Sequence, residues 1–264
     1  MSSEIPAFDS EKLNTINAEK VVYKSINGQN LEYAICYPEI EPKGVAMFIH
    51  GGGWRSNDLN RLLPHAKYAA FCGAVGVSVD YRLNGETTDV RDGLKDCADA
   101  LNHIRKTVRE KYGKDLQITA LGDSAGGYYA VCSGSQKVLS LADENAKIVD
   151  FVVDLNGIVD LTGKWSYGIK ADEQTAKKYS PLYNVTKGDA PVLIMHGDED
   201  KTVDIADAFA YEKALKEKGV ECETRIIHGA AHAFILFDYH RENKLVVETL
   251  RFVIKKLFEK WQRG

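Results

Sequence analysis

A serine framed by glycines is the first residue whose surroundings suggest chemistry. Ser124 stands in Gly-Asp-Ser-Ala-Gly-Gly at 122–127, after the apolar run 118–121 and before the apolar stretch 128–131. This spacing suits a sharp strand-to-helix turn that exposes the hydroxyl, because glycines let backbone segments approach closely. The helix start would favour negative charge beside Ser124 and would aim the Ala125 amide at a bound carbonyl. The pattern alone also fits a tight glycine turn with an exposed serine, so other groups must decide.

A second glycine-rich segment, His-Gly-Gly-Gly-Trp at 50–54, follows the apolar run 45–49. Three successive glycines leave amides free to stabilise a developing negative charge, and each such donor is worth about 10²–10³ in rate. We therefore predict an oxyanion hole made by the amides of Gly51, Gly52 and Ala125, rather than merely a flexible loop. His50 is expected to be structural.

Three side chains near these segments are predicted to border the substrate. They are Trp54, which would wall the pocket, Asp123 beside the nucleophile, and Trp165 in the segment between Ile158 and Pro181. That segment is the one evident insertion, and residues 159–180 are candidates for a small cap.

A serine hydroxyl becomes a strong nucleophile when a histidine takes its proton and a carboxylate orients that histidine. The expected chain order after this type of turn is serine, acid, histidine. The run 192–195 ends in His-Gly-Asp-Glu-Asp at 196–200, and the run 223–227 ends in a loop with His228 and His232. Chain order favours His232 over His228 and leaves Asp198, Glu199 and Asp200 open. The contexts of His65, His103 and His240 are helical or superficial, so they are weaker candidates.

The elements that must position these residues alternate along the chain. Short continuous apolar runs at 45–49, 75–79, 118–121, 151–155 and 192–195 are typical of strands buried on both faces. Apolar residues at three- and four-residue steps predict amphipathic helices over 94–108 and 246–261. The stretches 21–26 and 31–37 around Asn-Gly predict a hairpin. The sequence therefore predicts a mostly parallel sheet covered by helices on both faces, with active-site groups at the carboxyl ends of the strands.

Composition limits the classes of function. The chain has 264 residues, 44% hydrophobic and 27% charged, with a net charge of −4. This predicts one domain over 1–264 and argues against a nucleic-acid partner, which would need a basic face. Without an apolar run of about 20 residues or a signal-peptide pattern, we expect no membrane association and a cytoplasmic location. The five scattered cysteines predict reduced thiols and no zinc site.

Together these motifs resemble the esterase/lipase group of the α/β-hydrolase superfamily, over about Val21 to Trp261. His-Gly-Gly-Gly-Trp is similar to its oxyanion motif and Gly-Asp-Ser-Ala-Gly-Gly to its nucleophile elbow. The resemblance implies Asp200 as the acid, four residues after His196, and His232 as the base, from Gly-x-x-His-x-Phe at 229–234. The triple-glycine motif looks most like small acetyl or feruloyl carbohydrate esterases. Two departures are Arg55-Ser56-Asn57, where a glycine is often found, and Asp204, where a proline is often found.

The resemblance implies an α/β-hydrolase fold and a serine ester hydrolase that forms an acyl-enzyme through Ser124, His232 and Asp200. No metal or cofactor is expected. The expected substrate is a small ester with a short acyl group on a soluble alcohol, acetylated sugars among them. An amide hydrolase, such as a formamidase or small peptidase, is the alternative, and a non-catalytic ligand-binding homologue is a weaker one. The sequence leaves open a homo-oligomer.

Overall fold

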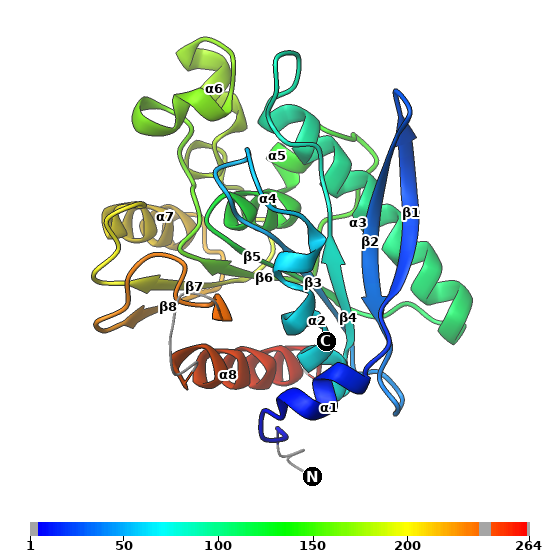
Figure 1. Cartoon of the computed structure of the whole chain (residues 1–264). Coiled ribbons are helices and arrows are strands. Elements are labelled where there is room, and N and C mark those ends of the chain that lie inside the picture. Colours follow the sequence, from blue (N-terminus) through cyan, green and yellow to red (C-terminus); the bar gives the residue numbers. More distant parts are fainter. Residues whose placement is uncertain (1–4, 238–243, 263–264) are drawn as a thin grey trace.

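The computed structural model describes residues 5–237 and 244–262. Its centre is an eight-stranded sheet in the order β1-β2-β4-β3-β5-β6-β7-β8 (Figure 1). The strands are β1 (Glu19–Ile26), β2 (Gln29–Cys36), β3 (Val45–Ile49), β4 (Val75–Val79), β5 (Ile118–Asp123), β6 (Phe151–Leu155), β7 (Val192–Gly197) and β8 (Cys222–Ile227). β2 pairs antiparallel with β1 and β4, while β3 to β8 pair in parallel. The α/β-hydrolase architecture expected from the sequence is confirmed.

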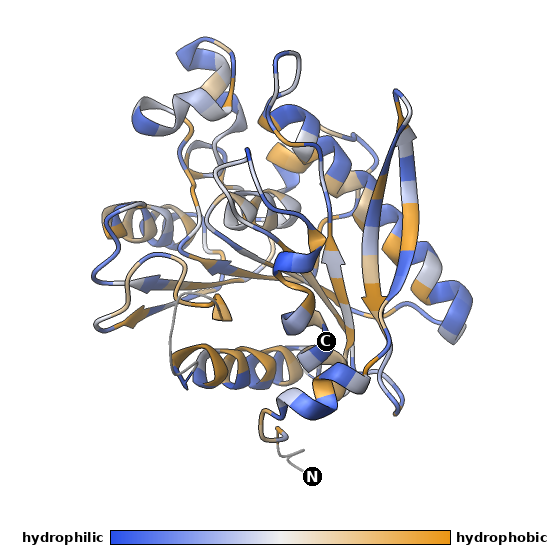
Figure 2. Cartoon of the chain, viewed as in Figure 1, coloured by the Kyte–Doolittle hydropathy of each residue, from blue (hydrophilic) through white to orange (hydrophobic). Residues whose placement is uncertain are grey.

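Helices cover both faces of the sheet. They are α1 (Ser10–Thr15), α2 (Leu63–Phe71), α3 (Val90–Tyr112), α4 (Ala125–Gly134), α5 (Gln136–Leu139), α6 (Glu173–Tyr179), α7 (Ile205–Glu217) and α8 (Lys244–Trp261), with the 3₁₀ turns η1 (Leu59–Arg61), η2 (Gly163–Gly168) and η3 (Pro181–Tyr183). Figure 1 shows α1 and α8 on one side of the sheet and α3, α4 and α7 on the other. Along α3 and α8, hydrophobic and hydrophilic residues alternate around the helix (Figure 2), as a helix that packs on one side requires.

The alternation of side chains along each strand divides the core in two. On β3, Val45, Met47 and Ile49 pack in the cluster that includes α3, α4 and α7, whereas Ala46 and Phe48 pack in the cluster that includes α2 and α8. All five are nearly or fully buried, because successive residues of a strand face opposite sides and both sides are covered. This explains why the runs predicted to be strands are apolar throughout.

The segment 159–180 lies apart from the sheet and contains η2 and α6. Figure 1 shows α6 at the edge of the molecule opposite α8. Trp165 of η2 packs edge-on against Trp54, with ring centroids 6.2 Å apart, and Lys164 Nζ donates to Thr202 O at 2.6 Å. The segment therefore connects the loop after β3 with the loop after β7.

Candidate active site

Ser124 stands at a strained corner between β5 and α4. Its backbone has φ 54° and ψ −119°, an unusual conformation for a residue other than glycine. The corner is possible because the neighbouring glycines lack side chains: a Cβ on Gly122 would overlap Gly126 O, and a Cβ on Gly126 would overlap Ile49 O. The Gly-x-Ser-x-Gly spacing thus lets β3, β5 and α4 approach closely while Ser124 turns to the carboxyl edge of the sheet.

The loops after β7 and β8 bring a carboxylate and an imidazole to this corner. His232 Nε2 lies 2.9 Å from Ser124 Oγ, and His232 Nδ1 lies 2.7 Å from Asp200 Oδ2. Asp200 Oδ1 accepts the amide hydrogens of Thr202 and Val203 at 2.8 and 3.0 Å. With Nδ1–H donated to the carboxylate, Nε2 is free to accept the Ser124 proton. This is the geometry of a serine nucleophile, a general base and an orienting acid.

The other histidines considered as the general base have different partners. His228 Nδ1 pairs with Asp198 Oδ2 at 2.8 Å, and the His228 side chain is 87% exposed. Nε2 of His65 lies 2.8 Å from Ile235 O, and His103 contacts Tyr33. His240 lies outside the described residues. The structure therefore brings together Ser124, predicted from its glycine motif, with Asp200 and His232, the acid and base that the resemblance implies.

His196 also contacts the carboxylate, at the same oxygen as His232. Its Nε2 lies 3.0 Å from Val203 O and 3.4 Å from Asp200 Oδ2. Burial opposes ionisation of Asp200, but hydrogen bonds from His196, His232 and two amides outweigh it and hold the Asp200 pKa well below its ordinary value. Burial raises the pKa of Asp154, the buried neighbour of His196, to about 6. The acid is thus held ionised between two imidazoles.

Sequence reasoning missed His196 in this role and missed Asn156 altogether. Asn156 follows β6 with φ 47°, is fully buried, and places Nδ2 3.4 Å from His232 Nδ1. Its Oδ1 has no hydrogen-bond partner among the described residues. The position of Asn156 directly after the apolar run 151–155, at the end of a strand beside β5, was the available signal.

The oxyanion prediction needs one correction. The Gly51 amide donates to Asp123 Oδ1 at 2.9 Å, so it is not free for a substrate oxygen and the prediction for Gly51 is wrong. Gly52 and Gly53 do not donate their amides to any other described residue. Ala125 is the first residue of α4, where an amide has no acceptor within the helix. Gly52, Gly53 and Ala125 are therefore the candidate donors.

The three side chains predicted to border the substrate are buried in the structure. Trp54 is fully buried and packs edge-on against Tyr128, with ring centroids 5.7 Å apart. Trp165 is 8% exposed and Asp123 only 2%, and Asp123 points to Gly51. The exposed aromatic ring here is Tyr167 of η2, 38% exposed, with the Arg55 guanidinium 4.4 Å above it. The polar ends of the loops, rather than the tryptophans, face solvent.

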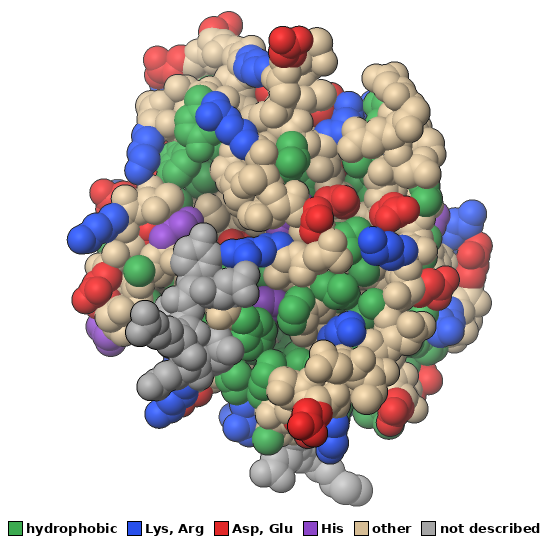
Figure 3. Space-filling view, viewed as in Figure 1, with side chains coloured by type: hydrophobic (Ala, Val, Ile, Leu, Met, Phe, Trp, Pro, Cys, Tyr) green, Lys and Arg blue, Asp and Glu red, His purple; other side chains and the backbone are tan. Residues whose placement is uncertain are grey.

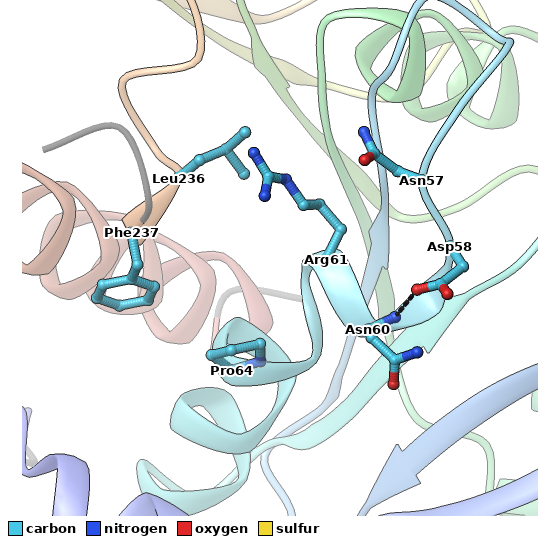
Figure 4. Close-up of a pocket in the computed structure, with 7 residues that line it drawn as sticks. All are labelled: Asn57, Asp58, Asn60, Arg61, Pro64, Leu236 and Phe237. Atoms are coloured by element: carbon cyan, nitrogen blue, oxygen red, sulfur yellow. Dashed lines mark hydrogen bonds between the residues drawn. The ribbon is translucent and has the colours of Figure 1, made fainter.

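A groove lies between η1 and the loop that carries His232. Its volume is about 360 Å³, and it is lined by Asn57, Asp58, Asn60, Arg61, Pro64, Leu236 and Phe237 (Figure 4). Figure 4 shows the Arg61 side chain extending toward Leu236 across the groove. Acidic and basic side chains are interspersed over the face seen in Figure 3. The groove thus combines amide, carboxylate and guanidinium groups with a short apolar wall.

Comparison with known proteins places these features in a family. A model of the BD-FAE family matches residues 35–215, more than half of the chain. The chain belongs to the BD-FAE family. The match includes the glycine loop, Ser124 and Asp200, whereas His232 lies beyond its end.

Solved structures resemble this BD-FAE chain over nearly its whole length. Thermogutta terrifontis esterase 2 phosphorylated by paraoxon has a TM-score of 0.81 and 28% identity, covering 92% of this chain and 94% of that one. The propionate-bound form has a TM-score of 0.79 and 27% identity over the same shares.

Curated relatives of this BD-FAE chain include Lipase 2 of Moraxella sp. (strain TA144), 26% identical over 75% of this chain and 56% of the relative. Esterase LipC of Mycobacterium tuberculosis is also 26% identical, over 75% of this chain and 55% of the relative. The chain thus spans little more than half the length of either.

No helix in residues 5–237 or 244–262 combines the length and hydrophobicity needed to cross a bilayer. The same residues hold no group of three or more His, Cys, Asp or Glu side chains placed to bind a metal ion.

Proposed function

We propose that this chain is a serine carboxylic ester hydrolase that cleaves short acyl esters through an acyl-enzyme. The observation that carries the proposal is the continuous contact from Ser124 Oγ to His232 Nε2 at 2.9 Å and from His232 Nδ1 to Asp200 Oδ2 at 2.7 Å. The similarity to Thermogutta terrifontis esterase 2 across nearly the whole chain supports it.

In the proposed reaction, Ser124 Oγ attacks the ester carbonyl while His232 Nε2 takes the hydroxyl proton. The oxyanion accepts hydrogen bonds from the amides of Gly52, Gly53 and Ala125. Collapse of the tetrahedral intermediate breaks the bond to the alcohol, which leaves with the proton from His232. Water then attacks the acyl-enzyme, again with His232 as base, and releases the acid and free Ser124. Asp200 holds the imidazole in the required tautomer throughout.

We base the proposed alcohol on the groove between η1 and residues 236–237, whose lining includes Asn57, a hydrogen-bond donor to Gly51 O in the glycine loop. Its amide and carboxylate side chains offer donors and acceptors to hydroxyl groups, and Pro64, Leu236 and Phe237 form a short apolar wall. We therefore propose a soluble, hydroxyl-rich alcohol with a short acyl group, such as an acetylated sugar, rather than a long-chain lipid.

Hydrolysis of p-nitrophenyl acetate, butyrate and octanoate tests the reaction and the acyl length. We expect the acetate to be cleaved fastest and Asp200→Asn to lower kcat about 10⁴-fold, because the wrong tautomer of His232 then faces Ser124. Octanoate as the best substrate would contradict the short acyl group. Absence of cleavage of all three esters would contradict the esterase itself.

One observation favours a second candidate, an amide hydrolase. The acylamino-acid-releasing enzyme of Arabidopsis thaliana is 28% identical over 53% of this chain, although this covers only 20% of that protein. N-acetyl-alanine p-nitroanilide distinguishes the two: the esterase proposal predicts that kcat/KM for this amide lies far below that for p-nitrophenyl acetate.

A further inference from the structure

The turn formed by Arg55, Ser56 and Asn57 binds two carbonyl oxygens of the glycine loop, those of Gly51 and Gly52. Asn57 Nδ2 donates to Gly51 O at 3.1 Å. Ser56 Oγ and Arg55 N each donate to Gly52 O at 3.1 Å. The turn is thus hydrogen-bonded to the two peptide groups that lead into Gly52 and Gly53.

These contacts fix the directions of the candidate oxyanion donors. In a planar trans peptide the C=O and N–H point in opposite directions, and the described residues contain no cis peptide. Gly51 O belongs to the same peptide group as Gly52 N. It accepts from Asn57 Nδ2 and from His50 Nδ1, the latter at 2.8 Å. Because these two donors fix the direction of the Gly51 carbonyl, they also fix the Gly52 N–H, which points away from Asn57 and His50.

Asn57 reaches this position through an unusual backbone. Its φ is 75°, in the left-handed region that asparagine tolerates better than most side chains. This residue belongs to the segment that lacks the glycine often found after the tryptophan. Asparagine takes the backbone conformation that a glycine would allow and adds a side-chain donor that a glycine lacks. Strained positions of this kind persist where the surrounding structure requires them.

We propose that Asn57 is a positioning residue that orients the Gly52 amide toward the oxyanion formed at Ser124. This inference rests on the proposed esterase function. It assigns to Asn57 a contribution to the rate, and no part in binding p-nitrophenyl acetate, which lacks the hydroxyl-rich alcohol proposed for the groove.

Replacement of Asn57 by Ala tests the proposal with p-nitrophenyl acetate. The concentration of active sites is measured by stoichiometric phosphorylation of Ser124 with paraoxon. The value of kcat then refers to folded enzyme alone. We expect kcat to fall about 10- to 100-fold, less than the loss of about 10²–10³ for a donor removed entirely, and KM to change by less than about twofold. The inhibition constant of a short-chain trifluoromethyl ketone should rise in parallel with the loss in kcat, because its adduct with Ser124 carries the same oxyanion.

Two further variants separate the hydrogen bond from the backbone conformation. Asn57→Gly keeps the left-handed backbone without the donor, and we expect it to lose as much kcat as Asn57→Ala. Asn27→Ala is the matched control, since Asn27 has φ 51° and lies exposed in the turn between β1 and β2. We expect this control to keep wild-type kcat and inhibition.

Wild-type kcat in Asn57→Ala, or recovery of wild-type kcat in Asn57→Gly, would overturn the positioning role while leaving the esterase intact. An Asn57→Ala variant in which KM changes and kcat does not would also overturn the positioning role. A wild-type protein that hydrolyses no ester would overturn the proposed function together with this inference.

Discussion

Asp123 Oδ1 accepts the amide hydrogen of Gly51 at 2.9 Å, so the residue before the nucleophile is hydrogen-bonded to the residue before the oxyanion donors. The two residues lie 72 positions apart in the chain but meet at the ends of the neighbouring strands β3 and β5. Asp123 is almost completely buried, and burial raises its pKa. The nucleophile turn and the glycine loop are therefore one connected unit.

Asp123→Ala tests this connection. The variant leaves the Gly51 amide without its acceptor, and an unpaired buried donor costs about 1–3 kcal/mol. We expect the free energy of unfolding in urea to fall by that amount and kcat for p-nitrophenyl acetate to fall with it. Asp123→Asn retains an acceptor oxygen and should lose less of both. Equal losses in the two variants would show that the hydrogen bond is not what matters.

The Ser124 turn should not tolerate a side chain at Gly126. A Cβ there would overlap Ile49 O and lie 2.6 Å from the carbonyl carbon of His50, so β3 and α4 would have to separate. We expect Gly126→Ala to lower the free energy of unfolding by about 1–3 kcal/mol or more and to abolish most activity. Gly113→Ala is the control, because Gly113 ends α3 in open space at φ 69°. Gly113→Ala should lower the free energy of unfolding but leave kcat unchanged. Equal kcat in Gly126→Ala and Gly113→Ala would contradict the close packing at the Ser124 turn.

His196 should contribute to the rate without touching the ester. Burial opposes its protonation, but Asp200, Val203 O and Asp154 outweigh burial and raise its pKa. We expect His196→Asn to lower kcat about tenfold or more with KM unchanged, since a hydrogen bond to a charged group is worth about 1.5–3 kcal/mol. His228→Asn is the control, because the exposed His228–Asp198 pair repeats the same residue types away from the site. A comparable loss of kcat in both variants would contradict the role of His196.

Much of this arrangement could be predicted from the sequence, for identifiable reasons. The strands 45–49, 75–79 and 151–155 were predicted with their observed bounds, because strands buried on both faces must be apolar throughout. Chain order left three acids open, and the motif resemblance chose Asp200, which contacts His232 in the structure.

The site residues that the sequence predicted wrongly or did not predict depend on orientation and on contacts across the fold. The sequence does not show which way a peptide group faces, so it predicts Gly51 as an oxyanion donor, whereas the Gly51 amide donates to Asp123 in the structure. It does not show how deeply an aromatic ring is buried, so we predict that Trp54 walls the pocket, whereas the structure shows its side chain fully buried. Asn156 reaches His232 from the end of a different strand, and spacing along the chain does not encode that contact. His196 lies four residues before Asp200, and we use that spacing only to choose the acid, not to predict their contact.

Acid should weaken the structure through His65. Its Nε2 donates to Ile235 O in the loop that follows His232, and burial lowers its pKa from 6.5 to about 4. The His65 imidazole therefore binds a proton more readily in the unfolded chain than in the folded one. The stabilisation from neutral His65 is complete above pH 6.5 and is lost as the pH falls toward 4, amounting to about 3 kcal/mol.

Urea unfolding between pH 7 and 4 measures this loss. His65→Gln can still donate to Ile235 O but does not titrate, so its free energy of unfolding should fall less steeply with acid than that of the wild type. Identical pH dependence in the two proteins would contradict the assignment to His65.

The central claim, that Ser124 is the nucleophile activated by His232, is tested most directly by stoichiometric reaction with paraoxon. Thermogutta terrifontis esterase 2 is phosphorylated by this compound. We predict release of one equivalent of p-nitrophenol per wild-type chain, a phosphoryl adduct on the peptide containing Ser124 by mass spectrometry, and parallel loss of esterase activity. Ser124→Ala should give no adduct, and His232→Ala should react far more slowly. An adduct on another residue, or an active wild-type enzyme that acquires none, would contradict the account.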